Sequence, residues 1–142
     1  MLYSFLHSKK SEDTLIMALR LSIALIFIWF GLMKVAGYDS VSDLVENSIL
    51  PASMSSGGGL LALGILEVVI GVLILTNKFL LFTYSILFLH LLGTFSTFIF
   101  GWSVVFSPHF PILSLSGEFV VKNITLVLSA LVVLVHEERK RG

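Results

Sequence analysis

The segment GGGLLALGILEVVIGVLILT, Gly57–Thr76, indicates the architecture of the whole chain. A helix of about 20 apolar residues spans the hydrocarbon core of a bilayer, and this stretch has that length and composition. One carboxylate, Glu67, lies near its centre. An ionisable group at that depth costs roughly 3 kcal/mol on insertion scales, so it normally faces protein or water and marks a functional site. We therefore expect the rest of the chain to shelter Glu67 from lipid.

The composition of the whole chain indicates a membrane protein. Its 142 residues are 56% hydrophobic and 13% charged, with a mean hydropathy of +1.01, whereas a soluble domain carries about 25% charged residues. The formal net charge of zero argues against nucleic acid as a partner. The absence of cysteine excludes thiolate catalysis and Cys-ligated metal centres within this chain. We expect one integral membrane domain over residues 1–142, embedded in the lipid bilayer.

Four apolar segments predict an all-α membrane protein, a bundle of four transmembrane helices. We place the spans at about residues 14–36, 57–76, 79–101 and 118–136. Thr14 is the expected N-cap of the first span, and Glu118 is expected to open the last span. The polar residues Thr76–Lys78 predict a tight turn between the second span and the third.

The first long connection, residues 38–56, is expected to carry a short interfacial helix. Its apolar residues recur at helical spacing, opposite Asp43, Glu46 and Asn47. These apolar residues are Val41, Leu44, Val45 and Ile49. Pro51 is expected to end this helix.

The distribution of basic residues predicts the orientation. Neither residues 37–56 nor residues 102–117 contain Lys or Arg. The basic residues of the N-terminus, the middle turn and the C-terminus are Lys9, Lys10, Lys78, Arg139, Lys140 and Arg141. The positive-inside rule therefore places both termini on the cytoplasmic side and the two long connections outside, with Tyr38 and Trp102 in an outer aromatic belt.

Each span carries one stripe of small or polar residues at helical spacing. The stripes are Arg20, Ala24, Phe27, Gly31 and Lys34; Leu60, Gly64, Glu67 and Gly71; His90, Gly93, Thr94, Thr97 and Gly101; and Glu118, Lys122, Thr125 and Ser129. Small residues allow helices to approach closely, and hydroxyl groups form hydrogen bonds between helices. We therefore expect all four stripes to face the interior of the bundle.

Depth indicates which ionisable residues can meet. Arg20 lies roughly 20 Å along the helix axis from Lys34, toward the cytoplasmic side. Glu67 and His90 are both expected near the midplane, whereas Lys34 and the charged pair of the last span lie in the outer half. That half is richer in positive charge, so it would attract an anion or an electron-rich oxygen such as a quinone carbonyl.

Several of these residues have a purely structural alternative. Arg20 and Lys34 could extend to the two interfaces, since their long side chains allow it. Glu67 could be a protonated hydrogen-bonding group, and His90 could link two helices. A single buried His is a poor basis for a haem site. Lys122 could serve only as the ion-pair partner of the carboxylate one turn before it.

Five segments occur in an order and at separations that resemble a known family. They are LRLSIALIFIWFGLMK (Leu19–Lys34), ENS (Glu46–Ser48), GILEVVIGVLIL (Gly64–Leu75), TFSTFIF (Thr94–Phe100) and GEFVVKN (Gly117–Asn123). From about Leu15 to Val135 the chain closely resembles the YkgB/RclC family of bacterial inner-membrane proteins, within the DoxX-like group. The resemblance implies a four-helix inner-membrane protein linked to resistance to reactive chlorine and other oxidants. The wider group includes the small subunit of a thiosulfate:quinone oxidoreductase.

The resemblance also implies which polar positions matter: Arg20, Lys34, Asn47, Glu67 and Lys122. The first outer loop is shorter than in the RclC type, and Asn123 follows Lys122 where the family has Asp. Together with the depth argument, this predicts one ligand or ion-pair cavity formed by Arg20, Lys34, Asn47, Glu67, His90, Glu118 and Lys122. We assign no catalytic residue and no metal ligand.

Three classes of function follow from these observations. The first is an accessory membrane protein of oxidant resistance, which the family resemblance favours. The lack of a redox cofactor motif or cysteine argues against enzymatic activity in this chain. The second is a membrane subunit of a quinone-linked oxidoreductase, in which quinone is the candidate ligand and a partner protein brings the redox cofactor. The third is a small transporter or channel, for which a homo-oligomer could supply a second half.

Overall fold

The computed structural model describes residues 8–38, 42–55 and 57–142, and this described part of the chain is all-helical. The long helices are α2 (Lys9–Val35), α4 (Gly57–Thr76), α5 (Leu80–Phe95) and α8 (Leu115–Arg141). The short ones are α3 (Ser42–Glu46), the 3₁₀ helix η1 (Ala52–Met54), α6 (Thr97–Phe100) and α7 (Trp102–Val105). By length and composition, four helices can cross a membrane, α5 and α6 counting as one over Leu80–Phe100. This confirms the predicted helical class and the four spans.

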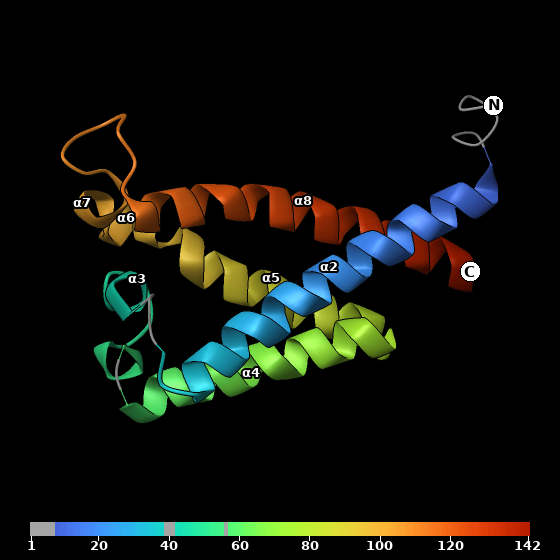
Figure 1. Ribbon diagram of the computed structural model, residues 1–142, viewed down its shortest axis with the longest axis horizontal. Coiled ribbons are helices and arrows are strands. Elements are labelled where there is room, and N and C mark those ends of the chain that lie inside the picture. The colour runs from blue at the N-terminus through green and yellow to red at the C-terminus, as the bar shows by residue number, and fades with distance from the viewer. Residues whose placement is uncertain (1–7, 39–41, 56) are drawn as a thin grey trace.

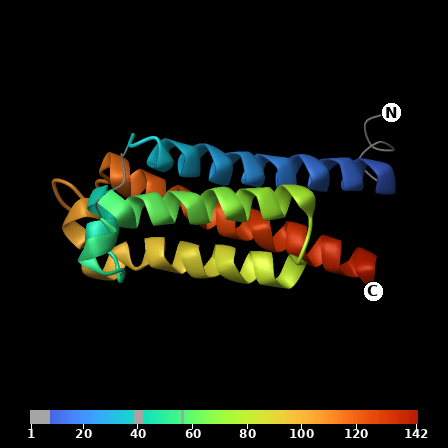
Figure 2. The same ribbon diagram turned by 90° about the horizontal axis from the view of Figure 1, so that it is seen from below.

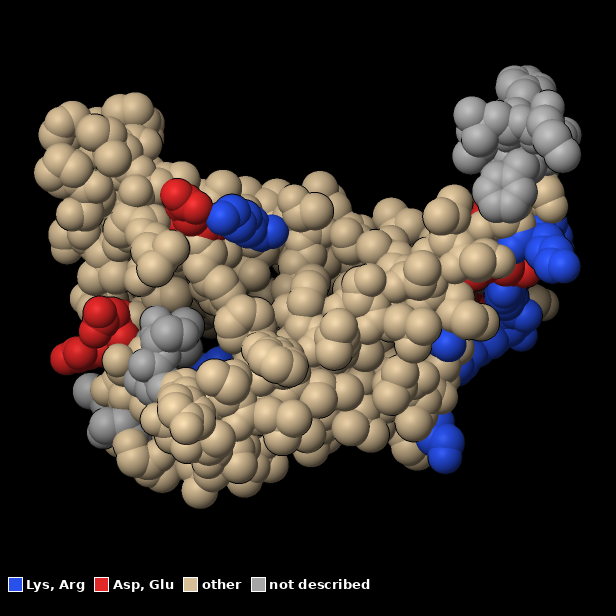
Figure 3. Space-filling view, in the orientation of Figure 1, with Lys and Arg blue, Asp and Glu red and all other residues tan. Residues whose placement is uncertain are grey.

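The long helices form a four-membered ring in which α2 contacts α4, α4 contacts α5, α5 contacts α8, and α8 contacts α2. Figures 1 and 2 show that α2 begins and α8 ends at the same end of the bundle. We call this the terminal end, and it also holds the turn between α4 and α5. The opposite, loop end holds α3, α6 and α7 (Figure 1). Figure 3 shows Lys and Arg side chains gathered mainly at the terminal end.

Large apolar side chains cover the outer surface of the bundle. Leu25, Leu89 and Leu128 are 62%, 70% and 57% exposed, and they lie midway along three different helices. A soluble protein rarely exposes such continuous apolar surface, whereas lipid accepts it. The outer surface therefore agrees with a multi-pass membrane protein.

The helix ends differ from those predicted. Thr14 is not the N-cap of the first helix, because α2 begins at Lys9 and the Thr14 hydroxyl donates to the Lys10 carbonyl oxygen within the helix. The last helix begins at Leu115, where the hydroxyl of Ser114 accepts a hydrogen bond from the Gly117 amide at 2.9 Å. Lys, Glu and Arg have high helix propensity, so the charged flanks extend the helices past the apolar stretches. The turn at Thr76–Lys78 is confirmed.

Glycines bring α2 and α4 into backbone contact. A Cβ atom on Gly31 would lie 2.6 Å from the Gly64 carbonyl oxygen, and one on Gly64 would lie 2.8 Å from the Gly31 carbonyl oxygen. Two turns further along α4, a Cβ on Gly71 would lie 2.9 Å from the carbonyl oxygen of Ala24. Only residues without a side chain allow this separation, as in other small-residue contacts between membrane helices. The α2–α4 pair is therefore the closest helix pair of the ring.

Three of the four predicted stripes face the interior, and the fourth does not. On α2 and α4 the small residues of the stripes are buried, and on α5 and α6 the stripe is buried or half-buried. On α8, Glu118 and Lys122 are exposed. The buried residues of α8 are Gly117, Val120, Asn123, Ala130 and Val133. The prediction for α8 is wrong because Glu118 and Lys122 pair with each other along the helix and need no partner inside the bundle.

The first connection packs onto the loop end of α5 and α6. Its helix, α3, spans only Ser42–Glu46 and ends before Pro51, in contrast to the prediction. Leu44 is 5% exposed and faces the bundle, and the Ile49 amide donates to the Ser96 hydroxyl at 2.8 Å. Val41, also predicted on the apolar face, lies outside the described residues. The connection therefore closes the loop end of the bundle.

The hydrophobic core fills the half of the bundle toward the terminal end. Its largest fully buried side chains include Ile23, Ile70, Ile74, Tyr84 and Leu87, contributed by α2, α4 and α5. Toward the loop end the interior holds polar side chains and a cavity in addition to buried apolar residues such as Leu63 and Val120. This half is where Glu67 lies.

Candidate functional site

A buried carboxylate held by two basic side chains forms the centre of the site. Glu67, in the middle of α4, is 6% exposed. Its Oε2 accepts a hydrogen bond from Lys34 Nζ of α2 at 2.7 Å, and its Oε1 lies 3.0 Å from His90 Nε2 of α5. The Lys34 and His90 side chains are 7% and 14% exposed. We call these three residues the Glu67 cluster.

Local packing explains how these three side chains meet. Gly64 lies one turn before Glu67, and a Cβ atom there would lie 2.8 Å from the Cβ of Lys34. The missing side chain lets the Lys34 stem lie against α4, so that its ammonium group reaches the carboxylate. On the other side, the Phe27 ring contacts the His90 ring edge to face, with centroids 5.8 Å apart. This contact fixes the orientation of the imidazole beside Glu67.

Burying the charged groups of the Glu67 cluster carries a large desolvation cost. Desolvating a charged pair costs several kcal/mol per ion, and close pairing with further hydrogen bonds is needed to offset that cost. Glu67 has such pairing on both carboxylate oxygens. Breaking a pair of this kind leaves a buried charge uncompensated, so each member depends on the other two.

A cavity of about 70 Å³ adjoins the cluster. A water molecule needs only about 10–15 Å³ measured in this way, so the cavity is large enough for several waters or part of a small molecule. Its walls are mainly apolar and aromatic, and include Phe27, Phe30, Leu63, Leu91, Phe119 and Leu126. The polar lining consists of the Glu67 cluster with Ser48, Thr94 and Asn123. Mostly apolar walls with a few converging polar groups are typical of ligand sites.

Asn123 is a cavity residue that the sequence did not identify as part of the site. It is 7% exposed and belongs to the buried face of α8, three residues after Val120. Its helical spacing from Val120 and Ala130 could have placed it on the buried face of α8. The charged residues Glu118 and Lys122 instead led to the prediction that their own face is the interior one. The amide adds a donating NH2 group and an accepting carbonyl oxygen to the cavity wall contributed by α8.

Four predicted site residues lie elsewhere. Glu118 and Lys122 form an exposed pair, 2.9 Å between Oε2 and Nζ, with side chains 49% and 73% exposed. Asn47 donates to the Asp43 carbonyl oxygen at the end of α3, where it packs against Gly101. None of these three lines the cavity. The predicted cavity therefore retains Lys34, Glu67 and His90.

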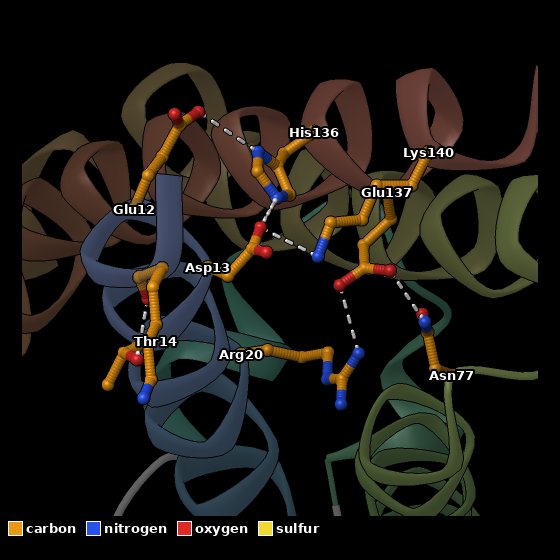
Figure 4. A network of polar contacts seen from close by, with 9 residues as sticks. Glu12, Asp13, Thr14, Arg20, Asn77, His136, Glu137 and Lys140 are labelled. Atoms are coloured by element: carbon orange, nitrogen blue, oxygen red, sulfur yellow. Dashed lines mark hydrogen bonds and ion pairs between the residues drawn. The ribbon is translucent and has the colours of Figure 1, made fainter. Parts of the chain in front are cut away.

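Arg20, the fourth, belongs to a separate polar network at the terminal end (Figure 4). Its NH1 lies 3.0 Å from Glu137 Oε1, and the Asn77 side-chain amide donates to Glu137 Oε2 at 2.8 Å. Beside this pair, Asp13 Oδ1 lies 2.7 Å from Lys140 Nζ and 3.0 Å from His136 Nε2. The predicted depth of Arg20 explains this separation. Arg20 lies roughly 20 Å along the helix axis from Lys34, the α2 residue that contacts Glu67, so its side chain cannot reach Glu67.

Metal binding has no support in the described part of the chain. No group of three or more His, Asp or Glu side chains there lies close enough together to hold a metal ion. Glu67 and His90 provide at most two ligands, and the third member of their cluster is an ammonium group, which repels a cation. The chemistry available at the site is hydrogen bonding and proton exchange.

Comparisons with protein-family models, with curated proteins and with solved structures found no match to this chain. The resemblance to the YkgB/RclC family thus stays a prediction, carried by the five segments quoted above. The structure itself describes a bundle whose four apolar helices are those of a multi-pass membrane protein.

Proposed function

We propose that this membrane protein binds a small lipophilic molecule with hydrogen-bond-accepting oxygens, of the quinone class, in the cavity beside Glu67. One observation carries this proposal: an ammonium group and an imidazole converge on one buried carboxylate at the wall of a mainly apolar cavity. The apolar walls suit a ring and its substituents, and the polar wall suits a carbonyl oxygen.

The Glu67 cluster can supply the hydrogen bonds and protons that such a ligand requires. Lys34 and His90 are donors that line the cavity, and the Glu67 carboxylate can accept a proton from either. Reduction of a quinone to a quinol consumes two electrons and two protons. In this proposal the cluster exchanges protons with the bound ligand, and the electrons come from an oxidoreductase partner that carries a redox cofactor.

In the cell we propose an accessory role in oxidant resistance, of the YkgB/RclC type, in the bacterial inner membrane. The gathering of basic residues at the terminal end supports cytoplasmic termini. The loop end, near which the cavity lies, would then face outward, with α3 at the outer interface. An extracytoplasmic oxidant-stress function fits a site that opens on that half of the membrane.

Ligand binding can be tested on purified protein by native mass spectrometry with a short-chain ubiquinone analogue. We expect one quinone per chain for the native sequence, and at least about tenfold weaker binding for His90→Phe, which removes a donor at the polar wall. Lys122→Gln is the matched control, because this residue carries a charge but lies outside the cavity. Equal quinone retention in His90→Phe and Lys122→Gln would contradict the proposal.

A further inference from the structure

The terminal end of the bundle contains a second, larger cavity of about 480 Å³ between the start of α2 and the end of α8. Its described lining includes four basic residues and two carboxylates: Lys9, Lys10, Arg20, Lys140, Asp13 and Glu137. The excess of basic groups makes this cavity electropositive. It is separate from the site beside Glu67, and shares no lining residue with it.

Both carboxylates of this cavity are already neutralised. Asp13 is paired with Lys140 and contacts a histidine, and Glu137 is paired with Arg20 and accepts from an asparagine amide (Figure 4). Within the described chain, no carboxylate lies within ion-pair distance of Lys9 or Lys10. The two lysines are thus free to bind an external anion.

The deepest basic group of the cavity also retains an unused donor. The Arg20 side chain is 15% exposed, and its Nε is buried without a hydrogen-bond partner among the described residues. A buried N–H group without a partner costs free energy. Because this Nε is not accessible from the cavity, Arg20 contributes positive charge at the base of the cavity, and direct contact with an anion falls to the surface lysines.

The border of the cavity is apolar on one side. Met17 lines it and is 52% exposed, and Leu21, one turn further along α2, is 44% exposed. The cavity therefore lies where the charged first turns of α2 meet the apolar surface that faces lipid. A ligand that fits both features has an anionic headgroup and acyl chains.

We propose that this cavity binds the headgroup of an anionic phospholipid, with the phosphate near Lys9 and Lys10 and an acyl chain along Met17 and Leu21. Basic pockets between membrane helices bind such headgroups, and each nearby Lys contributes about fivefold in affinity. A free phosphate ion offers the same charge, but it would make no use of the apolar border.

The test uses the full chain in detergent, with phosphatidylglycerol, phosphatidylcholine and sodium phosphate as probes and native mass spectrometry as readout. For Lys9→Gln/Lys10→Gln we expect about 25-fold weaker phosphatidylglycerol binding, and no change in the weak phosphatidylcholine binding. Lys78→Gln/Arg139→Gln is the matched control, because it removes the same charge from exposed residues at the same end, outside the cavity. It should change binding less than about twofold.

Two outcomes would overturn the proposal. An equal loss of phosphatidylglycerol in both double variants would show attraction by surface charge alone. Displacement of the lipid by sodium phosphate at concentrations comparable to that of the lipid would show a site for free anions. If the double variant fails to fold, the single variants Lys9→Gln and Lys10→Gln keep the test open, with about fivefold weaker binding expected for each.

Discussion

The two polar centres of the bundle use the same arrangement in different surroundings. In each, one carboxylate is held by a basic side chain and by a second nitrogen donor: Glu67 by Lys34 and His90, and Glu137 by Arg20 and Asn77. The Glu67 cluster lies inside the membrane-spanning part beside apolar walls, whereas Glu137 lies near the end of α8 beside a wide basic cavity. The ligand proposed for each centre therefore follows from the surroundings of the paired carboxylate and not from the pair itself.

Removal of Lys34 should break the stronger of the two centres. Lys34→Met leaves Glu67 with only His90, and loss of one partner of a buried pair costs about 3–5 kcal/mol. Equilibrium unfolding in mixed micelles measures this loss. Lys34→Met/Glu67→Gln should recover part of it, because the double variant no longer buries an unpaired charge. A loss below about 1 kcal/mol for Lys34→Met would mean that the cluster is hydrated.

Removal of Arg20 should cost less, because water can reach the terminal end and rehydrate Glu137. We expect Arg20→Gln to lower the free energy of unfolding by about 1.5–3 kcal/mol, the range for a hydrogen bond to a charged group. The same unfolding assay applies. If Arg20→Gln lowers the free energy of unfolding as much as Lys34→Met does, the two centres do not differ in how strongly they depend on their basic partner.

A pair of glycine substitutions tests the contact that positions Lys34. Gly64→Ala places a Cβ 2.8 Å from the Gly31 carbonyl oxygen and from the Lys34 Cβ, so it should destabilise the protein by about 1–3 kcal/mol. Gly93→Ala is the control in the last turn of α5, where nothing lies within 4 Å of the added atom. It should be neutral or stabilising by up to about 1 kcal/mol, since Ala favours helix. Effects of the same sign would contradict this packing.

The smallest effect is expected at the exposed pair of α8. Lys122→Gln removes an ion pair whose two side chains are half or more exposed, and such pairs contribute about 0.3–0.5 kcal/mol on a helix. Thermal unfolding with and without added salt checks this, because salt should screen the small difference. If Lys122→Gln lowers the free energy of unfolding by more than about 1 kcal/mol, the Lys122 side chain must also make contacts inside the bundle.

The sequence allowed α2, α4 and α5 to be oriented, because the ionisable residues within each span lie among small residues of helical spacing. It failed for α8, whose interior face is Val, Ala and a single Asn, while its charged residues satisfy each other one turn apart. It also missed Glu137, because a carboxylate in a charged tail gives no sign that it folds back onto Arg20. Pairings within one helix are local, whereas pairings between distant residues depend on packing that no local pattern encodes.

The backbone contact between α2 and α4 has a mechanical consequence for entry into the cavity. Two helices that touch along Gly31, Gly64 and Gly71, with the side chains of Ile28, Val35 and Val68 packed tightly against these glycines, should move as one rigid unit. Between α2 and α8, in contrast, the rings of Phe30 and Phe119 meet edge to face with centroids 5.7 Å apart, and both line the cavity. Rotation of these two rings would admit a lipophilic molecule sideways from the bilayer, while Lys34 and Glu67 stay in register.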